Sequence, residues 1–302
     1  MKQWRYPASS GGEIQAYGWQ GQGEPRAIVQ FVHGIAEHAA RYDAFAQALC
    51  AKGIWVVAED HMGHGGSMGE TAGYFSGGWL AAVQDIYALQ QATSQAHPGV
   101  PYFLYGHSMG SFLTRTFLIE HPDCPLQGAI IAGTGWQSPV ALRLGLAICR
   151  REARRLGEKA VSPLVNRLMF GSYNKGIPAP KSTFAWLSRD DAAVAAYEAD
   201  PLCGFDATVG LARDMLGGLQ MIQDKRNLAK MNRALPILFL AGDRDPVGHY
   251  GKGVKTACAA FRRSGMQQVD MQLYPGGRHE MHNEINKDAV YQAVIDWIYA
   301  KL

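Results

Sequence analysis

The chain has 302 residues, 47% of them hydrophobic and 18% charged, which is typical of a soluble globular protein with a large core. Its formal net charge of +3 is too small to indicate a nucleic-acid partner, and no basic stripe with interleaved aromatic residues occurs. No run of about 20 apolar residues is present, so no membrane-spanning segment is expected.

The N-terminus and the cysteines indicate a reducing compartment. The first residues lack the apolar core of a signal peptide. The five cysteines are odd in number and scattered through apolar contexts, which is typical of buried free thiols. None has a partner at metal-ligand spacing. We therefore expect a cytoplasmic protein that has no disulfide framework, no metal site and no cofactor.

Strands alternate with helices over most of the chain, and this pattern predicts an α/β fold with a doubly wound, mostly parallel sheet. The first two strands form a predicted hairpin. The predicted strands cover residues 3–6, 13–19, 27–33, 54–58, 102–105, 127–133, 236–241 and 269–274. The predicted helices cover 39–52, 78–97, 112–119 and 208–224, with one that ends near 264 and a last one from about 286.

The alternation stops between residues 136 and 206. Arginine-rich helical stretches alternate there with short loops that contain glycine and proline, and no strand of the earlier type occurs. This change predicts a helical cap inserted into one core. We therefore divide the chain into a first core segment over 1–135, a cap over 136–206 and a second core segment over 207–302.

A Gly-x-Ser-x-Gly pentapeptide, Gly106 to Gly110, joins the apolar run 102–105 to the helical stretch 112–119. A strand, a tight turn with a serine at its apex and a helix predict a nucleophile elbow. The glycines are expected because a side chain would collide with the neighbouring strand and helix. The pentapeptide alone could occur by chance among 35 glycines. Its meaning depends on whether a base and an acid accompany Ser108.

Candidates for the acid and the base follow two later strands. A serine nucleophile needs a histidine that takes its proton and a carboxylate that orients this histidine. We favour Asp245 over Asp243, because Asp243 is better suited to turn hydrogen bonds. We favour His279 over His282, which lies nearer the last helix. The order Ser, Asp, His along the chain, with each residue after a strand, predicts the α/β-hydrolase fold.

The developing oxyanion needs two backbone N–H donors. Met109 supplies one in this interpretation, because it follows the nucleophile at a helix N-terminus. Ile35, two residues after His33, is the best candidate for the other. Neither the pair His61 and His64 nor the pair His279 and His282 has the His-x-x-x-His spacing of zinc-binding helices. Apart from the two candidate bases, five histidines are interpreted as structural or oxyanion-loop supports: His33, His38, His61, His64 and His107.

Three segments resemble monoacylglycerol lipases and related lysophospholipase-like hydrolases. Residues 33–42 (His-Gly-Ile-Ala-Glu-His-Ala-Ala-Arg-Tyr) are similar to the oxyanion segment of that family, and residues 60–67 (Asp-His-Met-Gly-His-Gly-Gly-Ser) to a second loop. Residues 106–110 match its elbow. The resemblance implies that Asp245 and His279 are the acid and the base, and that Ile35 is the second oxyanion position. Ala36 and Ser111 depart from the family, which often has glycine there.

The main functional hypothesis is hydrolysis of carboxylic esters, with a lipid monoester such as a monoacylglycerol or a lysophospholipid as substrate. The broader serine-aminopeptidase-like group carries similar core motifs, so an amidase is the alternative. Such an enzyme needs an acid that binds the substrate amine, and the candidates are Glu37, Asp190, Asp191 and Glu198. A third hypothesis is a non-catalytic binding protein. The apolar stretch 140–148 could contact a membrane surface transiently, or simply pack over the pocket.

Overall fold

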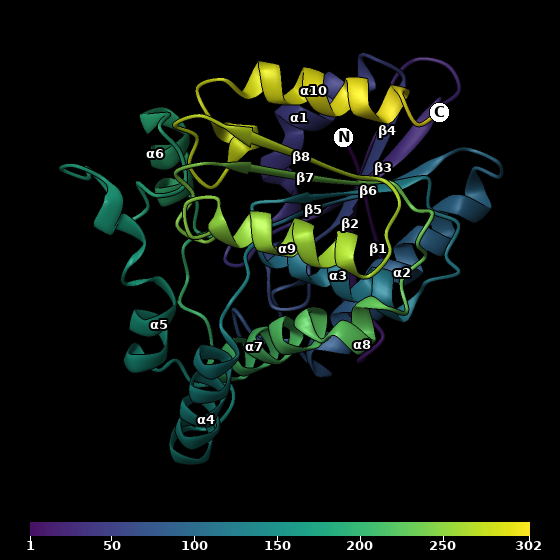
Figure 1. Cartoon of the computed structure of the whole chain (residues 1–302). Helices are drawn as coiled ribbons and strands as arrows, with labels where there is room; N and C mark the ends of the chain where they lie inside the picture. Colours follow the sequence, from purple (N-terminus) through teal and green to yellow (C-terminus); the bar gives the residue numbers. More distant parts are fainter.

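Eight strands form one sheet through the centre of the molecule (Figure 1). The computed structural model describes all 302 residues. The strand order is β1-β2-β4-β3-β5-β6-β7-β8, and β3 to β8 are parallel, whereas β1 and β2 are antiparallel to their neighbours. The strands are β1 Lys2–Pro7, β2 Glu13–Trp19, β3 Ala27–Val32, β4 Ile54–Glu59, β5 Tyr102–His107, β6 Gly128–Ala132, β7 Ile237–Gly242 and β8 Val269–Tyr274.

Helices cover both faces of this sheet, with α1 and α10 on one side and α2, α3 and α9 on the other (Figure 1). These helices and their neighbours are α1 Asp43–Cys50, α2 Gly78–Ala96, α3 Met109–Glu120, α7 Val209–Gln223, α8 Lys225–Leu228, α9 Lys252–Arg263 and α10 Lys287–Tyr299. Three short 3₁₀ helices complete the core, η1 Ala39–Tyr42, η2 Gly65–Ser67 and η4 Met281–Asn283.

The continuous apolar runs of the central strands fit this two-sided cover. In β5, Tyr102 and Leu104 pack beneath α2 and α3, whereas Phe103 and Tyr105 pack on the opposite face beneath α1 and α10. Successive side chains of a strand point to opposite faces, so a strand buried on both faces is apolar at nearly every position. Alternate residues of each apolar run therefore contribute to the two halves of the core, one on each face of the sheet.

The predicted α/β fold is confirmed, and every predicted strand is present with ends that differ by two residues or fewer. The observed helices differ more from the predicted ranges. The helix expected over 39–52 begins as η1 and becomes α-helical only at Asp43. Helix α8 was not predicted, because four residues are too few to show an apolar period.

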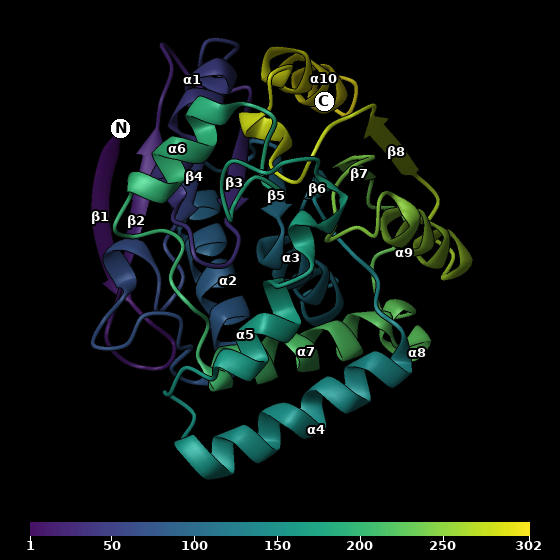
Figure 2. The same cartoon turned by 90° about the vertical axis from the view of Figure 1, so that its left-hand side faces the viewer.

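The segment 136–206 holds α4 Pro139–Leu156, α5 Pro163–Phe170, η3 Tyr173–Gly176 and α6 Asp191–Ala199. These helices lie beyond the carboxyl ends of the parallel strands, and Figure 2 views them face on. A serine followed by proline starts two of them: the Ser138 hydroxyl accepts the N–H of Ala141, and the Ser162 hydroxyl that of Val165.

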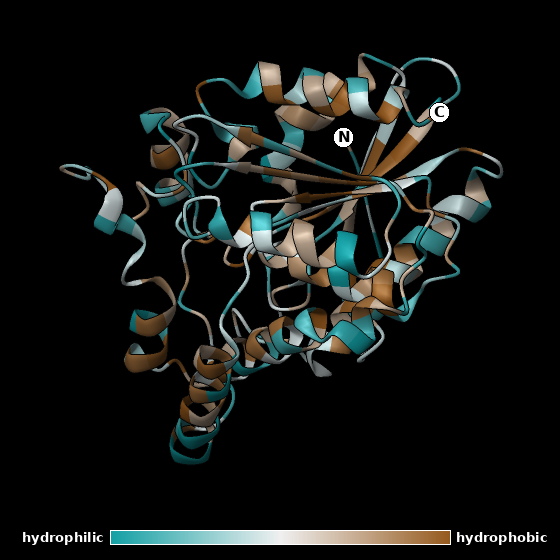
Figure 3. Cartoon of the chain, viewed as in Figure 1, coloured by the Kyte–Doolittle hydropathy of each residue, from teal (hydrophilic) through white to brown (hydrophobic).

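Helix α4 is the outermost element of this segment and packs on α7 (Figure 2). One end of α4 is apolar and the other hydrophilic (Figure 3). No helix in the chain combines the length and the apolar character needed to cross a bilayer.

Candidate active site

Ser108 occupies a strained turn between β5 and α3. Its φ of 54° and ψ of −121° lie in a region that non-glycine residues rarely adopt. The turn is tight because two chain segments cross beside it. A Cβ atom on Gly106 would overlap the Thr114 hydroxyl, and one on Gly110 would overlap the Val32 carbonyl oxygen. Both glycines are therefore required by close approach, and Ser108 lies at the apex of the elbow.

Ser111 and Ala36 stand where the similar hydrolases often have glycine, and both have defined contacts. The Ser111 hydroxyl donates a hydrogen bond of 2.6 Å to the carbonyl oxygen of Ser108 and so braces the turn. Ala36 adopts a φ of 54°, which is strained for a residue with a Cβ atom. Its carbonyl oxygen accepts the Tyr197 hydroxyl at 2.8 Å and the Gly204 N–H at 3.0 Å. Contacts from the segment 136–206 thus hold the Ala36 peptide.

The structure brings Asp245 and His279 together in the interior. Asp245 Oδ2 lies 3.0 Å from His279 Nδ1, and both side chains are buried. The other carboxylate oxygen of Asp245 accepts the N–H of Val247 at 2.8 Å. Asp243 points elsewhere, and its Oδ1 accepts the N–H of Gly276 at 2.8 Å. Of the two aspartates after β7, only Asp245 reaches the histidine.

The surroundings of His279 favour its charged form. Burial lowers the pKa of an imidazole, but the Asp245 carboxylate outweighs this effect and raises the pKa of His279 above its ordinary value. The indole of Trp186 lies against the ring, with centroids 5.0 Å apart. Because Nδ1 faces Asp245, Nε2 is the nitrogen left to exchange a proton with a substrate or with Ser108.

His282 has a different environment from His279. Its ring stacks on Tyr42 with centroids 4.4 Å apart, and neither ring nitrogen has a hydrogen-bond partner. Burial lowers the pKa of His282 to about 3, so it is neutral at physiological pH. It has no carboxylate that would orient it as Asp245 orients His279.

Ser108 and His279 line one cavity of about 540 Å³. The floor of the cavity includes Ile35 and Ala36 from the loop after β3. Its walls come mainly from the segment 136–206 and combine aromatic with polar side chains. They include Asn166, Arg167, Phe170, Asn174, Phe184, Trp186, Tyr197, Phe205 and Asp206.

The two predicted oxyanion donors both lie at this end of the sheet. Met109 is the first residue of α3, so its N–H has no carbonyl one turn earlier in the helix. The N–H of Ile35 donates to no acceptor in the protein, and Ile35 lines the cavity beside Ser108. Each is therefore available to a ligand oxygen, and the helix dipole of α3 favours negative charge at Met109.

Glu37 supports the loop after β3 through several hydrogen bonds. Its Oε1 accepts the N–H of Gly34 at 2.6 Å and the Tyr42 hydroxyl at 2.9 Å, and it lies 3.2 Å from His107 Nδ1. The other ring nitrogen of His107 lies 3.3 Å from the carbonyl oxygen of His279. This chain of contacts connects the loop after β3 to the backbone of the predicted base.

Arg41 joins this loop to the segment after β8. Its guanidinium makes two parallel bonds of 2.8 Å to Glu280 and one of 2.5 Å to Glu37. Burial raises the pKa of both carboxyls, but the Arg41 charge lowers the pKa of Glu280 to about 2. The hydrogen bond from His107 and the Arg41 charge hold the pKa of Glu37 well below its ordinary value. Both glutamates are therefore charged at neutral pH. The Arg41–Glu280 pair leaves no local signal in the sequence, because the two residues are 239 positions apart.

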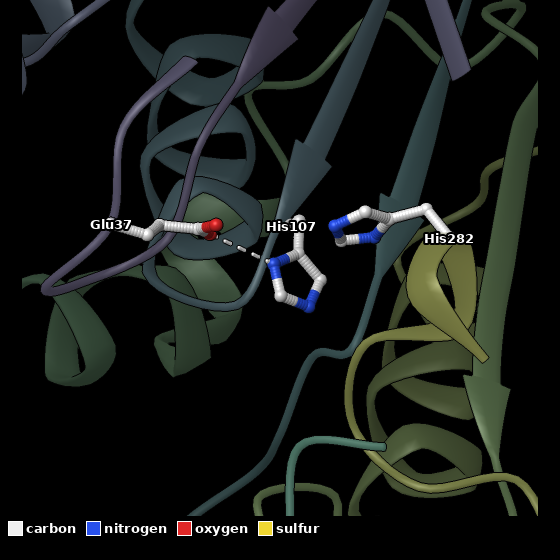
Figure 4. A group of neighbouring side chains, drawn as sticks. All are labelled: Glu37, His107 and His282. Atoms are coloured by element: carbon white, nitrogen blue, oxygen red, sulfur yellow. Dashed lines mark hydrogen bonds and ion pairs between the residues drawn. The ribbon is translucent and has the colours of Figure 1, made fainter. Parts of the chain in front are cut away.

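The side chains of Glu37, His107 and His282 converge in the interior (Figure 4). A carboxylate and two imidazoles could in principle hold a metal ion. The carboxylate is already committed, however, because donors from Gly34 and Tyr42 share Oε1 with His107, and Arg41 binds Oε2. We therefore interpret the group as part of the hydrogen-bonded support of the loop.

Three of the four acids proposed to bind a substrate amine do not line the cavity. Asp190 caps α6 through the N–H groups of two following residues, Asp191 pairs with Lys181, and Glu198 accepts the Ser182 hydroxyl. Glu37 does line the cavity but is bound to Arg41. Asp206, which sequence reasoning missed, is an exposed acid at the wall of the cavity.

The chain is similar to known lipases and to an esterase over most of its length. A monoacylglycerol lipase of Mycolicibacterium smegmatis is 30% identical over 94% of this chain and 92% of its own length. A monoglyceride lipase of Homo sapiens is 26% identical over 93% and 84%. The crystal structure of a thermostable carboxyl esterase from Bacillus coagulans in complex with glycerol superposes with a TM-score of 0.90, at 28% identity over 99% of this chain and 98% of that one.

The sequence model of the family described as Serine aminopeptidase, S33 (Hydrolase_4) matches residues 23–286. The match spans the elbow, the loop after β3, both candidate aspartates and His279. The chain therefore belongs to this family and has its α/β-hydrolase fold.

Proposed function

We propose that this protein is a serine hydrolase that cleaves carboxylic esters, with Ser108 as nucleophile, His279 as base and Asp245 as the acid that orients it. The observation that carries the proposal is the buried Asp245–His279 pair of 3.0 Å at a cavity that Ser108 also lines. A nucleophile on a strained elbow, a base and an orienting carboxylate are the set that acyl transfer requires.

The proposed reaction has two halves. Ser108 Oγ attacks the ester carbonyl carbon while His279 Nε2 takes the hydroxyl proton, and the resulting oxyanion accepts hydrogen bonds from the N–H groups of Ile35 and Met109. The C–O bond to the alcohol then breaks, and His279 returns the proton to the leaving oxygen. Water attacks the acyl-enzyme in the same way, with His279 as base, and releases the carboxylic acid and free Ser108.

A lipid monoester is the proposed substrate class. Aromatic side chains such as Phe170, Phe184 and Phe205 offer the cavity an apolar wall for an acyl chain, and Tyr197 and Asn174 add polar groups. The curated relatives named above are monoacylglycerol lipases, and the similar Bacillus coagulans esterase was solved with glycerol. These names support a small polyol such as glycerol as the leaving alcohol.

We further propose that residues 136–206 act as the cap that selects the substrate and contacts lipid surfaces. Its helix α4 exposes Val140 and Leu144, with 65% and 62% of their surfaces accessible. The same helix carries an exposed arginine cluster, Arg150, Arg151, Arg154 and Arg155. Apolar and basic groups on one exposed helix favour an anionic bilayer surface.

The decisive experiment measures turnover of p-nitrophenyl esters from acetate to palmitate, monoacylglycerols, lysophospholipids and aminoacyl-nitroanilides. We expect ester hydrolysis, with Ser108→Ala lowering kcat by about six orders of magnitude. Full ester turnover by Ser108→Ala would refute the mechanism.

Faster cleavage of nitroanilides than of esters would instead identify an amidase. The exposed Asp206 would then be the residue to test for binding of the substrate amine. Labelling of wild-type protein by a fluorophosphonate, absent in Ser108→Ala, separates an enzyme from a binding protein, because only an activated serine reacts.

A further inference from the structure

A second group of metal-ligating side chains lies where the segment 136–206 meets the core. His38 follows β3 in the loop that carries Ile35, whereas Asp200 and Cys203 form the turn after α6. His38 Nε2 lies 2.9 Å from Asp200 Oδ2. The ligand atoms of His38, Asp200 and Cys203 all lie within 4.8 Å of one another.

Hydrogen bonds hold these three residues in place without an ion. Asp200 Oδ1 accepts the N–H of Leu202 at 2.9 Å, and the Asp200 carbonyl accepts the N–H of Cys203 at 3.0 Å. The next residue, Gly204, donates its N–H to the Ala36 carbonyl at 3.0 Å. The turn after α6 is thus fixed to the loop that bears His38, and Asp200 keeps one oxygen free of backbone bonds. Such outer hydrogen bonds orient ligands in metal sites.

The local charge and the accessibility also favour a cation. The nearby guanidinium of Arg41 faces two carboxylates, Glu37 and Glu280, and Asp200 adds a third. Three carboxylates therefore lie near one guanidinium. Asp200 exposes 29% of its side chain, so an ion can enter from solvent. Cys203 makes no side-chain hydrogen bond that an ion would have to break.

We propose that His38, Asp200 and Cys203 bind a thiophilic divalent cation of the zinc class through one nitrogen, one oxygen and one sulfur atom. This donor set and three protein ligands fit a tetrahedral site whose fourth position is left to water. Binding displaces the proton of the Cys203 thiol, which goes to solvent, and His38 binds through Nε2 as the neutral imidazole with its proton on Nδ1. The site is distinct from the catalytic residues, and its existence does not depend on the proposed hydrolase activity.

The site would link the cavity wall to the oxyanion loop. The turn after α6 continues into Gly204 and Phe205, which line the cavity, and His38 follows Ala36 in the loop. An ion bound only by the folded state stabilises that state. We therefore expect zinc to raise the Tm of the full chain.

Cobalt(II) absorption tests the proposal on the full-length protein under reducing conditions. We expect a thiolate-to-cobalt charge-transfer band and visible bands of tetrahedral cobalt that saturate at one equivalent, and zinc should displace them. Binding should tighten as the pH rises, because the ion must displace the proton of the Cys203 thiol.

Matched variants assign the ligands. Cys203→Ser should abolish the charge-transfer band and the rise in Tm with zinc, and Asp200→Asn should weaken binding at least tenfold. Cys149→Ser removes another thiol of the same segment, in α4, and should bind as the wild type does. Circular dichroism of Cys203→Ser checks that it folds. Absence of a saturable band in the wild type, or an unchanged band in folded Cys203→Ser, would overturn the site.

Discussion

His279 shows how single residues set the proposed chemistry. One ring nitrogen faces Asp245, the indole of Trp186 covers the ring, and the backbone carbonyl of His279 lies beside His107. Burial alone would keep the imidazole neutral. The Asp245 carboxylate reverses this effect, so the pKa of His279 lies above its ordinary value.

Asp245→Asn should lower kcat/KM for esters by about four orders of magnitude, because the amide cannot stabilise the imidazolium. The base acts when neutral, so activity rises with pH through the pKa of His279. In the variant this acidic limb should move to lower pH, because the carboxylate that raises the pKa is gone. A pH–rate profile of both proteins measures the change.

Asp243→Asn is the matched control, since Asp243 binds the N–H of Gly276 and does not contact His279. It should keep the wild-type profile and nearly the wild-type rate. A larger loss of rate in Asp243→Asn than in Asp245→Asn would reverse the assignment of the acid.

At the scale of elements, the elbow depends on how closely α3 approaches the sheet. Gly110 lies in the first turn of α3, where alanine would otherwise be the better helix former. A Cβ atom at Gly110 would overlap the carbonyl oxygens of Val32 and His33. The strand β3 and the helix can only meet if this residue has no side chain.

Gly110→Ala should therefore unfold the protein or displace Ser108 enough to abolish esterase activity. Gly217→Ala is the control, because Gly217 lies within α7 and a Cβ atom there meets nothing within 4 Å. It should raise the free energy of unfolding by about 0.5–1 kcal/mol. Urea denaturation and esterase assays distinguish the two, and a stable, fully active Gly110→Ala protein would contradict the account of the elbow.

Helix α4 should determine binding to lipid vesicles. Replacing Arg151 and Arg154 by Gln should weaken binding to anionic vesicles by about 2 kcal/mol, at about 1 kcal/mol for each charge near the surface. The control is a double variant on α9, Lys255→Gln with Arg263→Gln, which removes the same amount of positive charge from another helix. It should leave binding unchanged. Cosedimentation at low and high salt measures the effect, and equal losses in both double variants would argue against docking through α4.

At the scale of the whole molecule, Arg41 and Glu280 join segments that are 239 residues apart in the chain. The folded state keeps the Glu280 carboxyl ionised, with a pKa of about 2 against about 4.5 for an exposed glutamate. A carboxyl whose pKa is lowered by folding stabilises the folded state at pH values above its ordinary pKa. This contribution is lost as the pH falls through the pKa of the folded state.

Glu280→Gln should lower the free energy of unfolding at pH 7 by about 3 kcal/mol, because the buried guanidinium of Arg41 loses one of its two carboxylate partners. The difference between wild type and variant should shrink as the pH falls below about 4.5 towards 2, where the wild-type carboxyl becomes protonated. Urea denaturation at several pH values tests this. A constant difference across that range would show that Glu280 acts through packing and not through its charge.

Most of the fold could be predicted because its signals are local. The strands were visible as short apolar runs, and the elbow as a strand, a glycine-flanked serine and a helix. Helix α8 and the start of α1 were missed, since short turns have no periodic pattern. The cavity walls were also missed: Trp186 and Tyr197 lie in the segment 136–206, where nothing in their neighbouring residues distinguishes them from core aromatics.

The amino-acid sequence was enough to predict the order of strands and helices, the α/β class and the candidates Ser108, Asp245 and His279, because each candidate follows an apolar strand. The packing of the chain adds the contact between Asp245 and His279 and the side chains that surround Ser108. It also brought Arg41 to Glu280 and His38 to Asp200 and Cys203. Such contacts depend on how distant loops pack at one edge of the sheet, and no local pattern encodes that packing.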